Sequence, residues 1–565
     1  MLTPWGEALD KEHVLQEYPR PQLRRDSYLN LNGLWAYAFT PTADAPLRFE
    51  GEILVPFSPE SELSGLQRTL LPGQYLWYRR YVVLPEGFNR GRLLLHFGAV
   101  DQIAAVYVDG RELFTHVGGY TPFCVDVTDA VRGGGFELLV RVSDETDSGW
   151  MTRGRQKLKP GGIWHSPQSG IWQTVWMESV PENYIRGLRI IPHFDDSKIE
   201  LWVAGEGECH AEFGGESYDF PAGTPAVLDV PEKHPWTPDD PYLYDLYLRL
   251  GDDEVESYFA MRKFSAEKDA DGNMRLFLNG VPYFQNGLLD QGYWSDGMLT
   301  APSDEALIYD IDLARRMGFN LLRKHMKIEP LRWYYHCDRL GMLVWQDMPA
   351  GGDRYDPLVV SAPAKTGMQL KDGNHTLFAR KSDESRSQYY RELREMINAL
   401  YNCPCIAMWV PFHEGWGQFD AAEVCAAILA MDTSRMIDHA SGWHDQGVGF
   451  IRSLHVYSRA VRIKDAPAER AVILSGFGGY VHRIDGHSYS EKSVGYQKFT
   501  SANSYKFALH DLYHGQIRPA YLDRLSAAVY TQLSDVEDEQ DGLVTCDRRV
   551  VKLSPELMRG IVRII

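Results

Sequence analysis

The sequence lacks several features that define whole classes of proteins. It has no apolar run close to the roughly 18 residues that a membrane-spanning helix needs. Its start, MLTPWGE, has no basic region followed by an apolar one, so no signal peptide is visible. Cysteines are few, with seven scattered along 565 residues, and Cys403 and Cys405 have neither metal-binding nor redox spacing. We therefore expect reduced thiols in a cytoplasmic protein that has no membrane partner.

Positive charge is also scarce, because 58 Lys and Arg residues face 77 Asp and Glu residues and leave a net charge of -19. A nucleic acid needs patches of Lys and Arg to neutralise its phosphates, so we expect no nucleic-acid partner. The acidic balance fits a small or neutral partner instead. The sequence shows no nucleotide-binding loop and no dedicated metal cluster, and we expect no cofactor and no metal ion.

The first half of the chain contains strand patterns without long helical ones. In residues 1–182, strand candidates such as residues 104–108 alternate with turns, and Asp109 with Gly110 forms a hairpin signal. Residues 183–266 are also strand-rich and have the length of a small immunoglobulin-like domain. We predict two β-sandwich domains with these boundaries.

Residues 267–565 instead alternate strand and helix patterns. The eight expected strands lie at residues 283–285, 320–323, 342–345, 406–410, 436–439, 453–456, 471–474 and 527–530. Between the first two strands, Ser303 is a plausible helix N-cap and Gly318 can end the same helix. Eight such units predict a (β/α)8 TIM barrel, whose chemistry lies at the C-terminal ends of the strands.

Polar and aromatic side chains gather near these strand ends. Each one alone is most simply a hydrogen-bonded barrel residue, but so many together indicate a site, because burying polar groups is costly. The candidate substrate-binding residues are Asp290, Lys324, His325, Asp347, His413, Trp416, His455, Tyr457, Asp535 and Glu537.

Glu414 is the candidate catalytic residue. It follows an apolar strand and has Trp409 and Trp416 close by in the sequence. A carboxyl group against aromatic rings keeps its proton longer, which suits a general acid, although a structural ion pair is the alternative. The neighbouring His413 could donate a hydrogen bond to a substrate hydroxyl or relay a proton, or it could be a satisfied core imidazole.

Residues 472–480 have the same sequence pattern as the segment that contains Glu414, but they lack its carboxylate. Residues 409–418 and residues 472–480 are both apolar runs that break into a Gly-rich turn. The first delivers Glu414, whereas the second has Gly476 where a carboxylate is expected.

Seven motifs in this order resemble one known family, glycoside hydrolase family 2, which includes β-galactosidases, β-glucuronidases and β-mannosidases. The motifs are WYRR at 77–80, VDG at 108–110, SGIWQTVW at 169–176, NLLRKH at 320–325, VWQD at 344–347, WVPFHEGWGQ at 409–418 and LSGFGGY at 474–480. The resemblance implies a jelly-roll β-sandwich, an immunoglobulin-like β-sandwich and a (β/α)8 barrel. It also implies a carbohydrate substrate and retaining hydrolysis by two glutamates.

Glu414 takes the place of the family's acid/base, and the sequence departs from the family pattern at two positions. His413 stands where the family normally has Asn, and Gly476 stands where the nucleophilic glutamate lies in a Ser-Glu-Phe/Tyr-Gly context. Without the nucleophile, double displacement loses its first step. We expect a void about the size of the lost side chain beside Gly476, which water could occupy, and hydrolysis either by inversion or by another altered route.

Inversion needs another base, and the sequence leaves the choice open. An inverting pair of carboxyl groups stands roughly 6.5–9.5 Å apart, against about 5–5.5 Å for a retaining pair, so that water can enter. The candidate bases are Asp290, Asp347, Asp535, Glu537 and His413.

Three explanations of Gly476 stay open: a glycosidase with an altered mechanism, a carbohydrate-binding protein without catalysis, and an engineered variant of a retaining enzyme. Residues 503–506 contain one residue too many for the Asn-x-Lys signature associated with glucuronidases, so neutral β-hexosides, galactosides first, are the default substrates. Proteins of the family often form dimers or tetramers, which leaves a homo-oligomer open.

Overall fold

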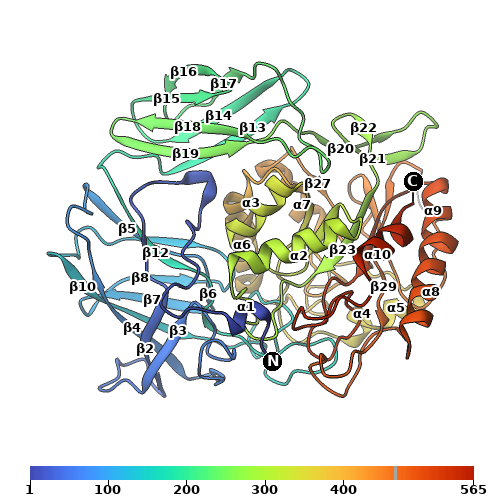
Figure 1. Ribbon diagram of the computed structural model, residues 1–565, viewed down its shortest axis with the longest axis horizontal. Helices are drawn as coiled ribbons and strands as arrows, with labels where there is room; N and C mark the ends of the chain where they lie inside the picture. The colour runs from blue at the N-terminus through green and yellow to red at the C-terminus, as the bar shows by residue number, and fades with distance from the viewer. Residues whose placement is uncertain (464–467, 565) are drawn as a thin grey trace.

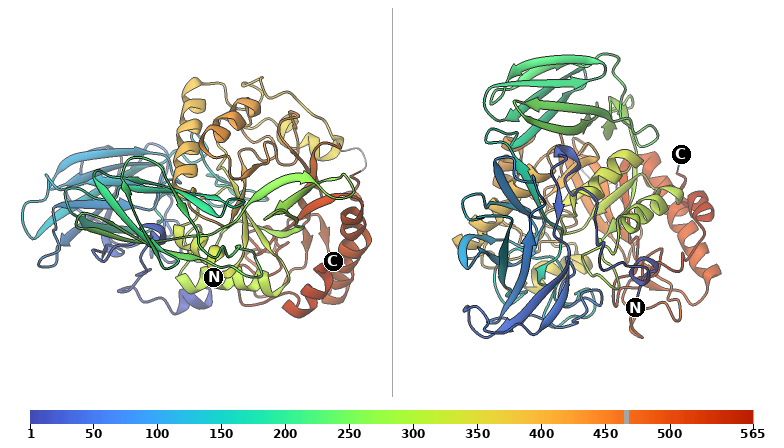
Figure 2. Two further views of the ribbon diagram at one scale, coloured as in Figure 1. Left: turned by 90° about the horizontal axis from the view of Figure 1, so that it is seen from above. Right: turned by 60° about the vertical axis from the view of Figure 1, so that its left-hand side comes forward.

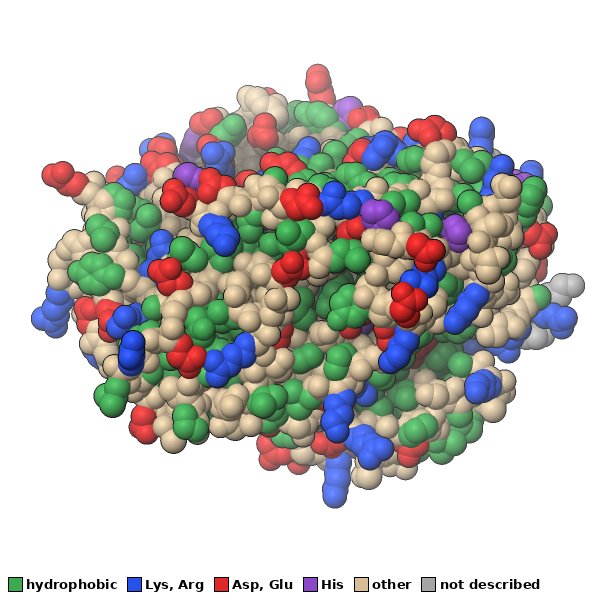
Figure 3. All heavy atoms as spheres, turned by 60° about the horizontal axis from the view of Figure 1, so that its bottom comes forward, with side chains coloured by type: hydrophobic (Ala, Val, Ile, Leu, Met, Phe, Trp, Pro, Cys, Tyr) green, Lys and Arg blue, Asp and Glu red, His purple; other side chains and the backbone are tan. Residues whose placement is uncertain are grey.

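The computed structural model describes residues 1–463 and 468–564. Figure 1 shows a β-sandwich built from the N-terminal part of the chain, a second β-sandwich above it, and an α/β body that holds the C-terminal half. The face drawn in Figure 3 carries acidic and basic side chains interspersed with apolar ones. We keep 1–182, 183–266 and 267–565 as the proposed domain boundaries.

The first sandwich consists of two main antiparallel sheets around one core that includes Trp35, Tyr78 and Phe97. The larger sheet has the order β3 (Gly51–Val55), β2 (Gly33–Thr40), β4 (Tyr75–Val83), β10 (Gly135–Ser143), β7 (Ile103–Val108) and β8 (Arg111–Val117). The smaller sheet has the order β1 (Leu29–Asn30), β12 (Val175–Val180), β5 (Arg92–Phe97) and β9 (Phe123–Asp126). The hairpin predicted at Asp109 and Gly110 is confirmed, since both have the positive φ that a tight turn between β7 and β8 requires.

The second sandwich is smaller and packs around its own apolar core. One sheet has the order β13 (Gly187–His193), β14 (Lys198–Ala204) and β17 (Ala226–Asp229). The other has the order β16 (Glu216–Pro221), β15 (Glu208–Phe213), β18 (Tyr244–Leu250) and β19 (Asp253–Phe259). Burial alternates strictly along β18, as a strand with one face in the core requires.

The C-terminal half forms the predicted barrel of eight parallel strands. Their order is β27 (Met436–Ile437), β26 (Ile406–Val410), β25 (Leu343–Asp347), β24 (Leu321–Lys324), β23 (Gln285–Asp290), β32 (Leu525–Thr531), β29 (Ala471–Gly478) and β28 (Ile451–Val456). The strands β27 and β28 end this sheet without pairing with each other, so the barrel is nearly closed. All its strands are largely buried, as strands covered on both faces must be.

Two barrel strands differ from the prediction in a way that matters for the site. The first runs from Gln285 to Asp290, because Val281 and Pro282 belong to a separate antiparallel sheet of β20 (Phe264–Lys268), β21 (Met274–Leu278) and β22 (Val281–Pro282). The hairpin signal that marks this sheet is Asn279 followed by a glycine, both with positive φ. The seventh strand continues to Gly478, so Gly476 lies within a strand and not in the turn after it.

Helices surround the barrel strands on the outside (Figure 2). The longer ones are α2 (Asp304–Arg316), α3 (Leu331–Leu340), α6 (Asp383–Leu400), α7 (Ala421–Met431), α8 (Ala502–Leu512) and α10 (Pro555–Val562). Short ones are α1 (Pro4–Glu7), α4 (Pro357–Val360), α5 (Ala362–Thr366) and α9 (Arg518–Asp523). Among the described residues, none of these has both the length and the apolar character needed to cross a membrane.

The first sandwich also reaches the barrel mouth through the segment that follows β10. Arg153 donates from Nη1 to the carbonyl oxygen of Gly352, at 2.7 Å, which fastens this segment to the barrel loops. Further along, Trp164 lies with its ring centre 4.9 Å from that of Trp416. Residues far apart in the sequence therefore share the space above the barrel strands.

The helix prediction around Ser303 is confirmed and can be tested for its contribution to stability. Ser303 Oγ accepts a hydrogen bond from Ala306 N at 3.2 Å, which satisfies one free N–H at the start of α2. Ser303→Ala should lower the free energy of unfolding by about 1 kcal/mol. Ser361→Ala is the matched control, because Ser361 precedes α5 without a capping hydrogen bond from its side chain. Equal midpoints of thermal unfolding for both variants would contradict this role.

Candidate active site

A pocket of about 190 Å³ lies at the C-terminal end of the barrel strands. Its lining combines titratable, aromatic and small residues: Arg155, Ile163, Leu289, His325, His413, Glu414, Trp416, Tyr457, Val494, Gly495, Tyr496, Thr531, Glu539 and Asp541. Five of the residues predicted from the sequence are among them, namely His325, His413, Glu414, Trp416 and Tyr457. The position matches the end of the barrel where such folds carry their chemistry.

Glu414 is held in the pocket by an unusual backbone conformation. Its φ is +48°, a left-handed value that costs a non-glycine residue on the order of 1 kcal/mol or more. Two hydrogen bonds support it: Glu414 N donates to Ser441 O, and Trp443 Nε1 donates to Glu414 O, both at 2.9 Å. The side chain is 13% exposed, and its Oε1 lies 2.6 Å from Nδ1 of His455. The carboxylate is thus aimed by both its backbone and a histidine from the end of β28.

Below Glu414, the guanidinium of Arg323 is fully buried at the end of β24. Its Nε and Nη2 each donate to Asp347 at 2.9 Å, and Nη2 also lies 3.0 Å from Nδ1 of His413. Burial raises the pKa of Asp347, but the charge of Arg323 outweighs this effect and holds that pKa below its usual value. One cation therefore connects the ends of the second, third and fourth barrel strands.

His413 is neutral at physiological pH. Burial first, and then the nearby His325 and Arg323, lower its pKa well below the usual value for histidine. Because Arg323 donates to Nδ1, the ring proton belongs on Nε2, which lies 3.6 Å from Glu414 Oε2. The structure places His413 as a hydrogen-bonded imidazole that points a donor toward Glu414 and also borders the pocket.

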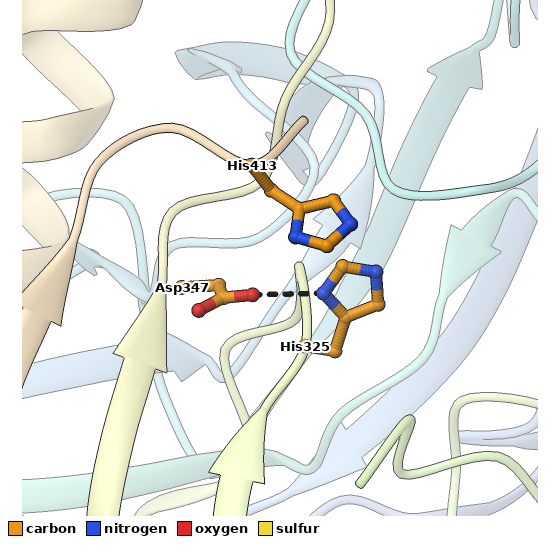
Figure 4. Close-up of side chains that lie close together, drawn as sticks. All are labelled: His325, Asp347 and His413. Carbon is orange, nitrogen blue, oxygen red and sulfur yellow. Dashed lines mark hydrogen bonds and ion pairs between the residues drawn. The ribbon is translucent and has the colours of Figure 1, made fainter. Parts of the chain in front are cut away.

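His325, Asp347 and His413 form the one group in the described part of the chain that has the donor atoms for a metal ion (Figure 4). Their ligand atoms lie within 4.8 Å of one another, and two histidines with a carboxylate are a known ligand set for transition metals. Arg323, however, already donates to Asp347 and His413. A fixed positive charge bonded to two of the three ligands opposes a second cation, so the group does not fit a metal.

All four carboxylates predicted as candidate bases lie outside the pocket lining and are already bonded, Asp347 to Arg323 as described above. Asp290 lies 2.6 Å from Nζ of Lys324, and Asp535 lies 2.7 Å from Nζ of Lys552. Glu537 accepts hydrogen bonds from Tyr293 Oη at 2.5 Å and from Ser166 N at 2.9 Å. These residues stabilise the strand ends and the loop after β32 from positions outside the pocket.

Sequence reasoning missed two acidic residues that do line the pocket, Glu539 and Asp541. The signal was the acidic run after the eighth strand, DVEDEQD, of which only the first two acids were considered. The run turns back on itself, because Val536 N and Glu539 N each donate to the carbonyl oxygen of the other, and Glu537 has a φ of +47°. This turn brings the later acids to the barrel mouth.

Two stretches of the sequence match domains of a known family. Residues 68–181 match the sugar binding domain of glycosyl hydrolases family 2, and residues 276–474 match its TIM barrel domain. The chain belongs to glycoside hydrolase family 2.

Curated family members are distant relatives. A β-galactosidase of Thermoanaerobacter pseudethanolicus is 24% identical over 356 residues, which cover 57% of this chain and 47% of that protein. The β-glucuronidase of Mus musculus is 22% identical over 399 residues, covering 64% and 58% of the two chains. The chain spans about half the length of the curated relatives it matches.

Solved structures share the whole fold. An uncultured Clostridium β-glucuronidase superposes with a TM-score of 0.75 at 17% identity, over 96% of this chain and 99% of that one. A family 2 β-galacturonidase of Eisenbergiella tayi, solved bound to galacturonate, has a TM-score of 0.71 at 18% identity, over 98% and 99%. At this identity the likeness shows the fold alone.

The void predicted beside Gly476 in this family 2 chain is wrong. A Cβ built on Gly476 would overlap the hydroxyl of Tyr457 and lie 3.2 Å from Nε2 of His455. The ring of Tyr457 stacks on Tyr496 with a centroid distance of 4.1 Å and an angle of 2°. Aromatic side chains therefore occupy the space where the family resemblance places the nucleophile.

This packing predicts that Gly476→Ala is destabilising even though the φ of Gly476 is not positive. Overpacking of this kind costs about 1–3 kcal/mol. The loss should be smaller in a Tyr457→Phe background, because the clashing hydroxyl is then absent. Gly187→Ala is the control, since a Cβ on that strand glycine meets nothing within 4 Å. Chemical denaturation of the four variants measures the coupling, and strictly additive losses would contradict the contact.

Proposed function

We propose that this chain hydrolyses O-glycosidic bonds of β-glycosides at the barrel mouth, with Glu414 as acid/base and without a covalent bond to residue 476. The observation that supports this proposal most strongly is the pocket, in which Nδ1 of His455 lies 2.6 Å from Oε1 of Glu414 and orients its carboxylate. The names of the relatives, β-galactosidase and β-glucuronidase, support the reaction class.

The lining suits a sugar. Trp416 borders the pocket and lies in an aromatic group with Trp164 and Tyr355. The C–H faces of a pyranose ring pack well against such rings, while hydroxyl groups find donors and acceptors on His413 and Thr531. The lining therefore offers both the apolar faces and the polar groups that a sugar ring needs.

The charge of the pocket favours neutral β-hexosides over uronides. Three carboxyl groups line it, but burial raises the pKa of Asp541 to about 8, so at neutral pH the charges of Glu414 and Glu539 stand against one permanently charged cation, Arg155. The Arg155 guanidinium is bonded to Glu539 at 2.9 Å, so its charge is already paired. A uronic acid carboxylate would meet net repulsion. Asn503 and Lys506 lie on α8 and do not line the pocket.

A carbohydrate-binding protein without catalysis is the second candidate. The stacked tyrosines favour it, because they fill the place from which a nucleophile would act. The same packing opposes an engineered loss of glutamate, since removing that side chain alone would leave space. A cytoplasmic location and a homo-oligomer remain part of the proposal, and light scattering would measure the assembly state.

Glu414→Gln should lower kcat/KM for β-galactosides by about 10²–10⁴-fold, because it removes the proton-transfer group but keeps the shape. Glu423→Gln is the matched control, an exposed glutamate on α7 nearby. Turnover of a panel of aryl and natural β-glycosides measures both. Sugar binding by calorimetry with no turnover of any member would favour the second candidate, and strong hydrolysis gained by Gly476→Glu would favour an engineered origin.

Charge discrimination gives a separate expectation. The value of kcat/KM for 4-nitrophenyl β-galactoside should exceed that for the β-glucuronide by at least tenfold, which corresponds to about 1.4 kcal/mol. The difference should shrink at high ionic strength, because it arises from charge repulsion. A preference for the glucuronide would show that the Arg155 charge is available to the substrate.

A further inference from the structure

Asp541 lies in the pocket on a different wall from Glu414. It comes from the loop after β32, and its side chain approaches Gly479, at the end of β29, where Oδ2 would lie 3.3 Å from a Cβ. Tyr496 packs over the same glycine and stacks on Tyr457, which covers Gly476. Asp541 therefore belongs to the side of the barrel where the family resemblance places the second carboxyl.

Asp541 is the pocket carboxyl that is not bonded to an Arg, Lys or His side chain in the described part of the chain. Within the described residues, Glu414 pairs with His455 and Glu539 pairs with Arg155 and His165. Asp541 has no ion pair there, and its Oδ1 accepts one hydrogen bond from Gln532 Nε2 at 2.9 Å. It is 2% exposed, so the residue is almost completely removed from bulk solvent.

The groups around Asp541 keep a proton on it. Burial, and next the negative charge of Glu539, raise the pKa of Asp541 to about 8, with a smaller contribution from Asp535. Lys552 acts in the other direction, but it is bonded to Asp535 at 2.7 Å. Below about pH 8 the group is a neutral acid, and above it the proton is lost. A carboxyl kept neutral at pH 7 is suited to protonate a leaving group.

We propose that Asp541 is the second catalytic carboxyl of this site and acts as its general acid, while Glu414 acts as the base. This assignment rests on the proposed function. In the mechanism that the family resemblance implies, Glu414 first donates a proton as an acid. Here Glu414 instead accepts a proton as a base.

The reaction balances with water as the only co-substrate. Asp541 gives its proton to the glycosidic oxygen, and the bond from that oxygen to the anomeric carbon breaks. A water molecule attacks the same carbon, and Glu414, held by His455, accepts the proton that the water loses. The products are the free sugar and the alcohol, and solvent exchange returns each carboxyl to its starting state. Direct attack by water inverts the anomeric configuration.

Leaving-group dependence tests which carboxyl is the acid. Asp541→Asn keeps an oxygen that can accept from Gln532, so its fold should be preserved. It should slow hydrolysis of methyl β-galactoside by about 10²–10⁴-fold, because the poor leaving group needs a proton. The 2,4-dinitrophenyl β-galactoside, which leaves without one, should lose less than about tenfold. Asp538→Asn is the matched control on the same loop, outside the pocket lining, and should keep the leaving-group dependence of the parent chain.

The pH dependence gives a second readout. Activity on the methyl glycoside should fall above about pH 8, and Glu539→Gln should move this fall to lower pH by removing the neighbouring charge. Carbon-13 NMR of aspartate-labelled protein should show one carboxyl that titrates near pH 8 and is missing in Asp541→Asn. This measurement needs no turnover.

The outcomes separate the two proposals. If no glycoside is hydrolysed, the proposed function fails, and the catalytic role of Asp541 fails with it. A second outcome is that the parent chain is active and the loss confined to poor leaving groups appears in Glu414→Gln but not in Asp541→Asn. In that case only the assignment of Asp541 is overturned. Retention of the anomeric configuration with a sugar attached to Tyr457, or a titration of Asp541 near pH 4, also overturns it.

Discussion

The buried guanidinium of Arg323 is the constraint on which the barrel mouth depends. A charge inside a protein is stable only when its donors are all met, and breaking such a network by removing one partner leaves a charge uncompensated. Arg323 donates to Asp347 of β25 and to His413 after β26. It also donates to the carbonyl oxygen of Ser475 in β29, at 2.8 Å. Its Nη1 also lies 3.4 Å from His455 at the end of β28. The hydrogen bonds to this one cation therefore fix the ends of these strands relative to one another.

This network explains why several predicted site residues support the pocket and do not act in it. Both carboxylate oxygens of Asp347 accept hydrogen bonds from Arg323, and Oδ2 also lies 2.8 Å from Nδ1 of His325. His413, made neutral by burial beside that charge, presents its remaining proton toward Glu414. The carboxylate of Glu414 is consequently oriented by histidines whose own positions Arg323 sets.

Gly476 and the position of Tyr457 depend on each other through packing. A glycine in β29 admits the tyrosine hydroxyl, and Tyr496 holds the tyrosine ring from the other side by stacking. A loop of the first sandwich also reaches this part of the pocket, where Arg155 and His165 bond to Glu539, the residue whose negative charge raises the pKa of Asp541. Two domains are thus needed to set the charge of one pocket.

Much of the fold could be read from the sequence because local patterns encode it. The eight barrel strands, the cap at Ser303 and the hairpin after β7 all follow from side-chain period and turn chemistry, which act over a few residues. Glu414 and Gly476 could be located for the same reason, because each is placed by its own strand. The first barrel strand was placed too early because Tyr283 still belongs to the hairpin at Asn279, where its N donates to Leu276 O.

The contents of the pocket were decided by contacts between distant parts of the chain. No local pattern says that Tyr457 fills the space at Gly476, that Arg155 from the first sandwich pairs with Glu539, or that the turn after β32 brings Asp541 to the mouth. Each depends on how buried charge and volume are shared among segments that meet only in the folded state. The sequence by itself determined the eight barrel strands and the glycine at position 476. The tertiary structure alone decided which side chains pack around that glycine, since packing and desolvation act between neighbours in space.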